Sequence, residues 1–597
     1  MKRYASKSLV ILTGLCFLLQ GSDLVAQSSA KVEQLLSKMT LDEKIGQMTQ
    51  VDLLAIKDKA DVAKYFLGSV LSGGGSDPAD NKPATWKASC DEVQMQALKT
   101  RLKIPLIYGV DAVHGHNNIE GAVVFPHNVG LGATRNPKLV ERAAQITARE
   151  VAATGIHWAF APCVAVSKDI RWGRSYESFG ECPDLAGELG AAAVRGFQTR
   201  LPGGFRVLAS TKHFAGDGGT ENGIDQGNTI CDEATFRKIH LAPYLPAIRA
   251  NSGTIMVSYN SWNGDKMHGN KHLLTDILKK EFGFQGFLIS DWAAIDQLPG
   301  DYKTEIESSI NAGLDMMMIP NGPGQAKNYA EFISLTRELV LEKRIPQERI
   351  DDAVRRILRA KFQSGVFEHP FASPNLMSEL GSPAHRKVAR DCVRQSAVLL
   401  KNDRNALPLS TKAGTVTVVG KGADDLGMQC GGWTIDWQGK SGNLTPGGTT
   451  ILAGLKNALR NSVNLTYSPD GSALNQASTV VVVIGEQPYA EMKGDKKDLS
   501  IQSEDAALVE KAKASGAKVV TILLSGRPLI LGSVLEQSDA LLAAWLPGTE
   551  GQGVADVLVG AYRPTGKLPR FWPRSNAQLG QPTVTDPLFS FGYGLTY

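Results

Sequence analysis

The chain has 597 residues, of which 43% are hydrophobic and 21% are charged, a composition typical of soluble globular proteins and not of disordered ones. This length exceeds what one hydrophobic core usually supports, so we expect at least two domains. The formal net charge is only +4, which offers no electrostatic footprint for nucleic acid or for an anionic membrane surface.

The first 26 residues have the pattern of a secretory signal peptide. Three basic residues within the first seven precede an apolar run at 9–19 and a small-residue cleavage site at 24–26. We therefore expect cleavage after Ala26 and export to the periplasm or the medium. The apolar run is shorter than the ~20 residues of a spanning helix, so stable membrane insertion is not expected. Leu15 precedes Cys16 where lipidation would want a small residue, which argues against a lipid anchor.

The remaining cysteines do not suggest a metal or redox motif. They are widely spaced and form no Cys-x-x-Cys pair, so neither a zinc site nor a thioredoxin-like motif is indicated. Whether they pair after export is not readable from the sequence. They are Cys90, Cys163, Cys182, Cys231, Cys392 and Cys430.

Residues 27–367 contain short apolar runs that end in polar residues and alternate with helix-like stretches. Such alternation is typical of a parallel sheet, and this many repeats predict a (β/α)8 TIM-like barrel. The runs lie at 104–115, 156–166, 206–217, 253–264, 286–295 and 313–321.

The active site of such a barrel lies at the carboxyl ends of its strands. Five polar residues stand at such ends in the predicted runs: Asp111, Lys212, His213, Tyr259 and Asp291. A strand-end aspartate is often only the cap of the next helix, but Asp291 is followed by Trp292, whose flat apolar face is of the kind that stacks on a sugar ring.

A segment rich in Pro, Gly and Ser follows the barrel, and we expect residues 368–395 to link two domains. Residues 396–597 then show a second α/β pattern with predicted strands at 415–420, 479–486, 517–526 and 540–548. Four strands are too few for another barrel and favour an open α/β sandwich domain. The Gly-x-Gly at 418–427 lacks a dinucleotide fingerprint, and we interpret it as a turn.

Two further clusters precede the second domain. Residues 169–181 gather Arg171, Arg174, Glu177 and Glu181 around a tryptophan, and such a cluster is usually a structural ion-pair network, although one arginine could donate a fixed fork of hydrogen bonds to sugar hydroxyls. The His-Gly-His at 114–116 lacks a third ligand at suitable spacing, so no metal is expected.

Two loops of the second domain carry candidate functional residues. The Gly-flanked loop at 431–439 contains Trp433 and Trp437, which are costly to expose without a partner. The loop after the strand at 479–486 contains Glu486 and Glu491. Together the two loops predict a lid that brings aromatic faces and a carboxyl group to the mouth of the barrel.

From residue 39 to residue 597 the sequence resembles family 3 glycoside hydrolases of the β-glucosidase and β-glucan exohydrolase type. The motifs that carry the resemblance are specific in their order: YGVDAVHG, RWGRSYES, KHFAGDGG, ISDWAAI and GGWTIDWQG. The resemblance implies that Asp291 is the nucleophile and Glu491 the general acid/base, with Glu486 a weaker rival. It also implies that Trp292 and Trp437 clamp a second sugar. Residues implied to hold or neighbour the terminal glucose are Asp111, Arg174, Lys212, His213, Met256, Ser258 and Tyr259.

The implied chemistry is retaining hydrolysis without a cofactor. One ionised carboxylate attacks the anomeric carbon while a protonated carboxyl about 5–5.5 Å away releases the leaving sugar. We expect Arg174, Lys212 or a protonated His213 to favour the charged form of Asp291, and apolar surroundings to keep Glu491 protonated. Gln226 departs from related plant enzymes, which tend to have an acidic residue there.

The expected function is an exo-acting β-glucosidase that releases glucose from the non-reducing ends of β-glucans and oligosaccharides. Alternatives are a β-xylosidase, a β-N-acetylglucosaminidase or a catalytically silent carbohydrate-binding protein. The loop after Lys212-His213-Phe214 has Asp217 and no histidine, unlike the acetylglucosaminidase branch. Linkage preference and oligomeric state are left open. Because the chain ends at GYGLTY, we expect two domains and no added carbohydrate-binding module.

Overall fold

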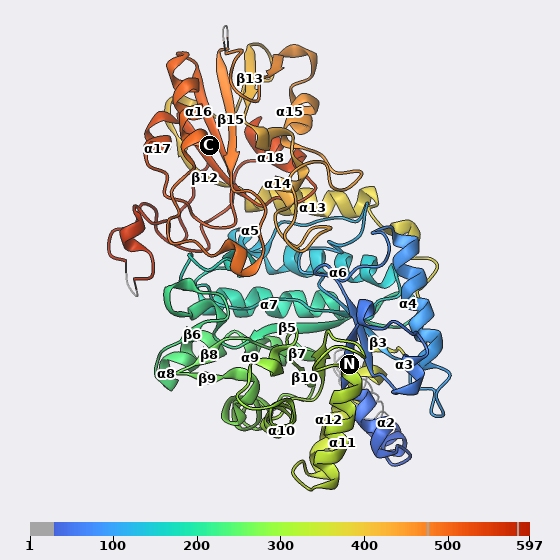
Figure 1. Cartoon of the computed structure of the whole chain (residues 1–597). Helices are drawn as coiled ribbons and strands as arrows, with labels where there is room; N and C mark the ends of the chain where they lie inside the picture. Colours follow the sequence, from blue (N-terminus) through green and yellow to red (C-terminus); the bar gives the residue numbers. More distant parts are fainter. Residues whose placement is uncertain (1–28, 475–476, 582–583) are drawn as a thin grey trace, which may run out of the picture.

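The computed structural model describes residues 29–474, 477–581 and 584–597, and shows two α/β units stacked one on the other (Figure 1). The predicted signal peptide lies outside the described residues. None of the helices in the described part combines the length and apolarity needed to cross a bilayer.

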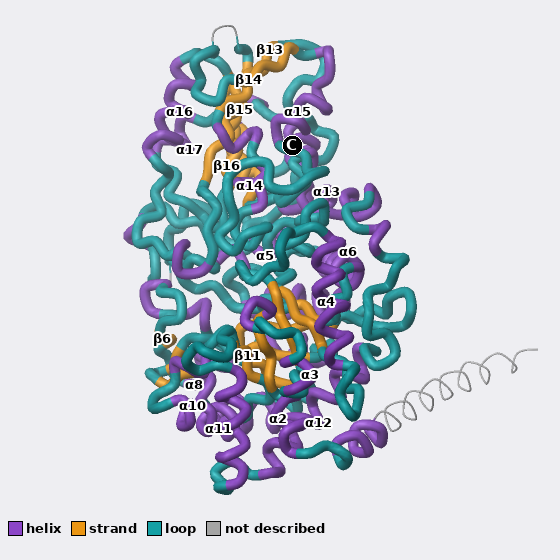
Figure 2. The backbone as a smooth tube through the Cα atoms, turned by 45° about the vertical axis from the view of Figure 1, so that its right-hand side comes forward, coloured by secondary structure: helices purple, strands orange, loops and turns teal. Residues whose placement is uncertain are grey.

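The first unit is a barrel of eight parallel strands. Their order in the sheet is β10-β7-β5-β4-β3-β2-β1-β11, and a parallel bridge from Ile289 to Met316 joins the two ends of the sheet. The strands appear as a compact group ringed by helices in the lower half of Figure 2. They are β1 (Thr49–Asp52), β2 (Ser69–Ser72), β3 (Ile107–Val110), β4 (Trp158–Ala159), β5 (Leu208–Phe214), β7 (Thr254–Val257), β10 (Phe287–Ile289) and β11 (Met317–Ile319).

Helices and a small sheet cover the barrel. The helices are α2 (Leu41–Gln47), α3 (Asp61–Lys64), α4 (Pro83–Ala97), α5 (Asn128–Thr134), α6 (Pro137–Ala153), α7 (Pro183–Phe197), α8 (Glu233–Phe236), α9 (Tyr244–Arg249), a π-helix at His272–Glu281, α10 (Tyr302–Ala312), α11 (Tyr329–Leu341) and α12 (Gln347–Ser364). The small sheet is made of β6 (Asn228–Thr229), β8 (Ser261–Trp262) and β9 (Asp265–Lys266).

Strands β1 and β2 were not among the six predicted runs. Five of the eight residues in their sequences, TQVD and SVLS, are polar, yet every residue in them is buried. The polar side chains are satisfied inside the barrel, where Gln50 Nε2 donates to Ser69 Oγ at 2.8 Å and Ser69 Oγ donates to the carbonyl of Ile107 at 2.6 Å. Hydrogen bonds between neighbouring strands therefore replace the apolar run that a sequence pattern detects.

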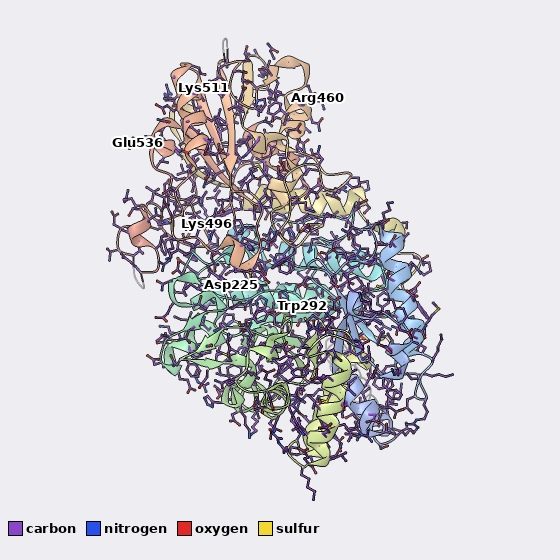
Figure 3. All side chains as sticks on the ribbon, viewed as in Figure 1. Asp225, Trp292, Arg460, Lys496, Lys511 and Glu536 are labelled. Atoms are coloured by element: carbon purple, nitrogen blue, oxygen red, sulfur yellow. The ribbon has the colours of Figure 1, made fainter. Side chains whose placement is uncertain are left out.

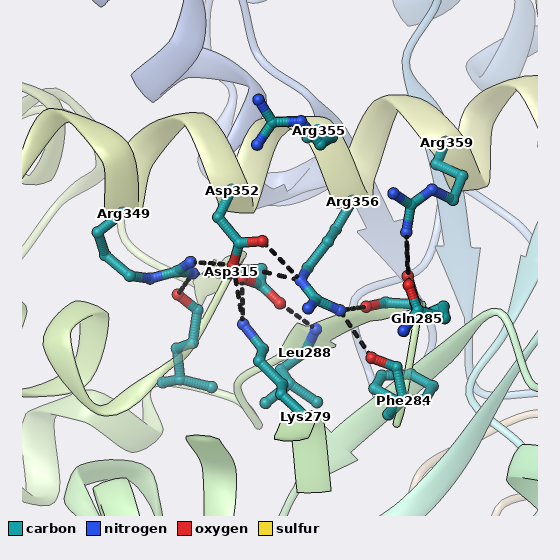
Figure 4. A network of polar contacts seen from close by, with 12 residues as sticks. Lys279, Phe284, Gln285, Leu288, Asp315, Arg349, Asp352, Arg355, Arg356 and Arg359 are labelled. Carbon is teal, nitrogen blue, oxygen red and sulfur yellow. Dashed lines mark hydrogen bonds and ion pairs between the residues drawn. The ribbon is translucent and has the colours of Figure 1, made fainter. Parts of the chain in front are cut away.

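A polar network fixes the end of the barrel opposite the second unit (Figure 4). Asp315, which precedes β11 and is fully buried, accepts from Lys279 Nζ at 2.7 Å and from the backbone N–H of Leu288 at 2.8 Å. Arg349 and Arg356 of α12 extend the network to Asp315 and to carbonyls that precede β10. The helix that closes the barrel is thus tied to its last two strands.

The second unit is a six-stranded sheet in the order β12-β17-β16-β15-β13-β14, parallel except for β12. The predicted barrel followed by an open α/β domain is confirmed, but two edge strands of the second sheet were not predicted. The strands are β12 (Val398–Asn402), β13 (Thr415–Val419), β14 (Asn464–Tyr467), β15 (Thr479–Gly485), β16 (Lys518–Leu524) and β17 (Ala540–Trp545), and the helices are α14 (Leu426–Cys430), α15 (Ile451–Leu459), α16 (Ser503–Ala514), α17 (Ser533–Gln537) and α18 (Gln552–Leu558).

The predicted connection at 368–395 contains most of helix α13 (Pro383–Ser396). Arg390 and Arg394 of this helix both donate to Asp556 of α18 at 2.6 Å. The connection is therefore anchored to the second unit along this helix.

Candidate active site

The carboxyl ends of the barrel strands face the second unit, and the candidate residues gather there. Asp111 follows β3, Lys212 and His213 lie in β5, Tyr259 follows β7 and Asp291 follows β10. Figure 3 shows Asp225 and Trp292 of the barrel and Lys496 of the second unit near the junction of the two units.

Asp291 is a buried carboxyl group with one unused oxygen. Its Oδ1 accepts from the backbone N–H of Trp292 at 2.8 Å, whereas its Oδ2 is buried without a hydrogen-bond partner and lies 3.9 Å from His213 Nε2. Burial raises the pKa of Asp291 to about 6, and the nearby charges of Arg174 and Lys212 limit that rise. Asp291 is therefore largely ionised at pH 7, and its Oδ2 has no hydrogen-bond partner among the described residues.

A bulge in β5 turns two consecutive side chains into the site. The pairing with β7 jumps from Thr211 opposite Ile255 to Phe214 opposite Val257, so Lys212 and His213 share one position of the neighbouring strand. Bulges of this kind re-aim side chains next to active sites.

The two side chains at the bulge have different partners and different charges. Lys212 Nζ donates to Asp111 Oδ1 at 2.8 Å. Burial lowers the pKa of Lys212, but Asp111 and Glu177 together raise it above its ordinary value. His213 binds Asp217 at 2.8 Å through Nδ1, and its Nε2 accepts from Arg174 at 3.0 Å. Burial and then Arg174 hold the pKa of His213 well below its usual range, so the expectation of a protonated His213 is wrong.

Arg174 joins the barrel part of the site to the second unit. Its guanidinium is buried and donates to both carboxylate oxygens of Glu177, at 2.8 and 3.0 Å. Its Nη1 lies 3.0 Å from Oε1 of Glu491, which comes from the second unit. One planar cation thus contacts a barrel carboxylate, a barrel histidine and the carboxyl group of the other unit.

Glu491 enters the site on a loop packed tightly against the barrel. The residue adopts φ +52°, and a Cβ added at Gly173 of the barrel would lie 2.0 Å from its carbonyl oxygen. Burial raises the pKa of Glu491 to about 8; Arg174 lowers it, and Asp225, Asp291 and Glu177 raise it. Glu491 is therefore mostly protonated at neutral pH, whereas Asp291 is mostly ionised.

The three tryptophans differ in exposure. Trp292 is 38% exposed and Trp437 is half-buried, so both have an accessible indole surface. Trp433 is buried, with Nε1 donating to Glu177 at 3.2 Å and the ammonium of Lys212 5.8 Å from its ring centroid. Trp433 is therefore shielded from solvent and packs against the charged residues Glu177 and Lys212.

The residues after β7 form another part of the site. Tyr259 donates its hydroxyl to the backbone carbonyl of Trp292 at 2.5 Å. Met256 and Ser258 are both buried, and the backbone N–H of Ser258 donates to the carbonyl of Phe214 in β5. Residues at and after the end of β7 thus link Trp292, the neighbour of Asp291, to the bulged strand β5.

Glu486 is engaged elsewhere. Its carboxylate accepts from Arg527 at 3.2 and 3.3 Å, from the Tyr489 hydroxyl at 3.0 Å and from the Gly526 N–H at 3.1 Å. These contacts occupy both of its oxygens, whereas Glu491 contacts Arg174 inside the site.

The structure also brings in residues that sequence reasoning did not assign. Asp225 accepts from Trp172 Nε1 at 2.9 Å and raises the pKa of Glu491, whereas its neighbour Gln226 binds Gln297 instead. His268 accepts from the backbone N–H of Asp291 at 3.1 Å. The sequence signal for Asp225 was its position next to Gln226, which departs from related plant enzymes. His268 stands in no recognisable motif, so the sequence did not point to it.

The histidines at 114–116 have structural contacts. His114 Nε2 lies 3.1 Å from the carbonyl of Trp433, and His116 Nε2 lies 2.9 Å from the Thr154 hydroxyl. Within the described ranges, the one group with ligand spacing for a metal is Cys163, His213 and Asp217, and both ring nitrogens of His213 already have partners. The six cysteines of these ranges are all unpaired.

Comparison with known proteins identifies the family. A model described as the glycosyl hydrolase family 3 N terminal domain matches residues 40–360, and the model of that family's C-terminal domain matches residues 397–597. The chain belongs to glycosyl hydrolase family 3. This family 3 enzyme is therefore a glycoside hydrolase.

The relatives of this family 3 enzyme cover most of its length. It is 35% identical to the lysosomal beta glucosidase of Dictyostelium discoideum, over 95% of this chain and 76% of the relative. It is 31% identical to the periplasmic beta-glucosidase of Salmonella typhimurium, over 95% of this chain and 80% of the relative. The crystal structure of an exo-1,3/1,4-beta-glucanase from a Pseudoalteromonas species is 42% identical, with a TM-score of 0.90 over 96% of this chain and 74% of that one.

Proposed function

We propose that this family 3 enzyme is an exo-acting β-glucosidase that removes glucose from the non-reducing ends of β-glucans and oligosaccharides, with Asp291 as nucleophile and Glu491 as acid/base. The observation that carries the assignment is the placement of two buried carboxyl groups around Arg174: Asp291, whose Oδ2 has no hydrogen-bond partner among the described residues, and Glu491, whose Oε1 lies 3.0 Å from Arg174 Nη1. Their pKa values, about 6 for Asp291 and about 8 for Glu491, support the same division of roles. Two carboxyl groups whose surroundings separate their pKa values divide the roles of base and acid.

The proposed reaction has two steps. In the first, Asp291 Oδ2 bonds to the anomeric carbon, the glycosidic C–O bond breaks, and the proton of Glu491 moves to the leaving oxygen. In the second, Glu491 takes a proton from water, the water oxygen bonds to the anomeric carbon, and the ester bond to Asp291 breaks. The two inversions give retention, and Glu491 ends protonated as it began.

The surrounding polar residues are proposed to hold the terminal glucose. Lys212 and Asp111 offer an ammonium and a carboxylate next to each other, and Arg174 offers guanidinium donors. His213, whose ring nitrogens both have protein partners, would orient Arg174 beside the sugar. Paired donors and acceptors of this kind suit vicinal hydroxyl groups. Trp292 and Trp437, with accessible indole surface, would stack on the second sugar.

Export is part of the proposal. The signal-peptide pattern at 1–26 supports it, and one relative is described as periplasmic. The relative described as an exo-1,3/1,4-beta-glucanase supports activity on both of these linkages.

Two assays test the function. The first compares nitrophenol release from β-glucoside, β-xyloside and β-N-acetylglucosaminide substrates, and the glucoside is expected to have the highest kcat/KM. A higher value for the xyloside would make the enzyme a β-xylosidase, and turnover of none would leave a carbohydrate-binding protein.

The second assay follows the anomer of glucose released from laminaribiose and cellobiose by NMR. Initial β-glucose is the expected product of a double displacement. Initial α-glucose would overturn the proposed mechanism.

A further inference from the structure

Arg527 is a fully buried arginine of the second unit, three residues after the end of β16. Its relative exposure is 0%, and its charge is matched by Glu486, whose Oε1 lies 3.2 Å from its Nη2. A buried ion pair is weak evidence for stability because desolvation offsets much of the attraction. The two segments that Arg527 reaches through its other hydrogen bonds are more informative than this ion pair.

One set of these hydrogen bonds reaches the loop that carries Glu491. Besides Glu486, which precedes Glu491 by five residues, Arg527 Nη2 donates to the carbonyl of Gly494, three residues after it, at 2.6 Å. The guanidinium also lies over the ring of Tyr489, 4.9 Å from its centroid. Arg527 therefore binds this loop on both sides of Glu491.

A second set reaches the barrel loop that leads to Arg174. Arg527 Nη1 donates to the carbonyls of Ile170, Arg171 and Trp172 at 3.0, 3.2 and 3.4 Å. The next residue, Gly173, donates its N–H to Asp495 at 2.8 Å and has no room for a Cβ against Glu491. The same guanidinium thus holds both segments whose side chains meet in the contact between Arg174 and Glu491.

We propose that Arg527 is a positioning residue that holds the Glu491 loop against the barrel loop of Arg174 and so sets the place of the acid/base. This proposal rests on the function proposed above, in which Glu491 protonates the leaving group. Lysine cannot reproduce the arrangement, because its single ammonium lacks the planar fork that reaches carbonyls of two segments at once. A misplacement of about 1 Å in such a group costs about 10²-fold in rate.

The test compares two substrates of the full-length enzyme. Laminaribiose has a poor leaving group that needs protonation, whereas 2,4-dinitrophenyl β-glucoside has a leaving group that departs without it. In Arg527→Lys we expect kcat/KM to fall about 10- to 100-fold for laminaribiose, a partial loss of the roughly 10²- to 10⁴-fold contribution of acid catalysis. For the dinitrophenyl substrate we expect a fall of less than about 3-fold. A purely structural defect would lower both values equally.

The matched control is Arg570→Lys. Arg570 is also buried in the second unit and also donates to a barrel carbonyl, that of Ser167 at 3.1 Å, but its hydrogen bonds do not include the Glu491 loop. We expect its kcat/KM values for the two substrates to change by the same factor. A substrate-selective loss in the control as large as in Arg527→Lys would overturn the proposal.

Glu491→Gln provides the benchmark that separates the two proposals. It should show the same substrate selectivity, with a larger loss for laminaribiose. If Glu491→Gln is not selective, the acid/base assignment fails. If Glu491→Gln is selective but Arg527→Lys loses activity equally on both substrates, the positioning role alone fails.

A milder variant covers the case in which Arg527→Lys does not fold. Tyr489→Phe keeps the ring beneath the guanidinium and removes only the hydroxyl that donates to Glu486. We expect about a 3- to 10-fold loss on laminaribiose and no measurable loss on the dinitrophenyl substrate. Equal effects on both substrates would again contradict the proposal.

Discussion

The proposed chemistry depends on a few single residues, and sequence motifs pointed to many of them. Asp291 and Glu491 stand in recognisable contexts, a strand end and a loop after a strand. The separation of their pKa values was not readable, because it depends on burial by both units and on Arg174. His213 shows the same limit: its neutral state follows from burial and then from Arg174, which lies 39 positions away in the sequence.

The pKa values of the two carboxyl groups predict the pH dependence of catalysis. With the proposed roles, protonation of Asp291 below about pH 6 would remove the nucleophile, and deprotonation of Glu491 above about pH 8 would remove the acid. We expect a bell-shaped profile of kcat/KM on laminaribiose with limbs near these values. For the dinitrophenyl substrate, whose leaving group needs no proton, we expect the acid limb without the alkaline limb. An unchanged alkaline limb would assign it to another group.

The raised pKa of Asp291 also predicts a cost in stability. Its pKa is about 6 in the fold against 3.8 ordinarily, so ionising it in the folded state destabilises the protein as pH rises from about 4 to 6. Asp291→Asn removes this cost, and we expect its free energy of unfolding at pH 7.5 to exceed that of the wild type by about 1–3 kcal/mol.

Urea unfolding at pH 7.5 and pH 4.5 measures this difference, which should shrink at the lower pH. Asp276→Asn is the control, because Asp276 is solvent-exposed and its substitution should not reproduce this stabilisation. A less stable Asp291→Asn at pH 7.5 would show that the carboxylate contributes favourable contacts.

At the scale of elements, the positions of the strands decide which residues meet. Apolar runs predicted six barrel strands, and β1 and β2 were missed because their buried polar side chains bond to neighbouring strands. The bulge in β5 was also beyond prediction, since it depends on the register with β7. Without this bulge, Lys212 and His213 would point to opposite faces of the strand.

The network around Asp315 offers a test of how the barrel end is held (Figure 4). Asp315→Ala leaves Lys279 buried without its closest partner, so we expect a loss of about 3–5 kcal/mol in the free energy of unfolding. Because the network lies at the amino ends of β10 and β11, away from the catalytic face, kcat/KM should change less than about 2-fold.

Arg359→Ala on the same helix serves as the control for Asp315→Ala. Its guanidinium donates only to the carbonyl and side chain of Gln285, both partly exposed contacts. We expect a loss below about 1 kcal/mol. Equal losses in the two variants, measured by urea unfolding, would contradict the central place of Asp315 in this network.

For the whole molecule, one buried hydrophobic cluster includes residues of both units. Ile170 and Tyr176 of the barrel belong to the same buried cluster as Val482, Tyr489 and Trp545 of the second unit. Tyr176 also donates its hydroxyl to the carbonyl of Tyr489 at 2.7 Å. The sequence predicted two units and a lid over the barrel mouth, but the extent of this shared core depends on side chains far apart in the chain.

This shared core predicts cooperative unfolding. We expect one calorimetric transition for the full-length enzyme, with activity and tryptophan fluorescence lost over the same temperature range. Activity lost at a clearly lower temperature than the main transition would show instead that the units separate before they unfold.

The measurement that tests the central claim most directly is trapping of the covalent intermediate. In a 2-deoxy-2-fluoro glucoside the fluorine slows both chemical steps, while a good leaving group keeps the first step fast enough to occur. The glycosyl-enzyme therefore accumulates, because its hydrolysis is slow. Peptide mass spectrometry of the inactivated enzyme should locate the sugar on Asp291, and Asp291→Asn should remain unlabelled. A label on Glu491 or Glu486, or a labelled Asp291→Asn variant, would contradict the assignment of Asp291 as the nucleophile.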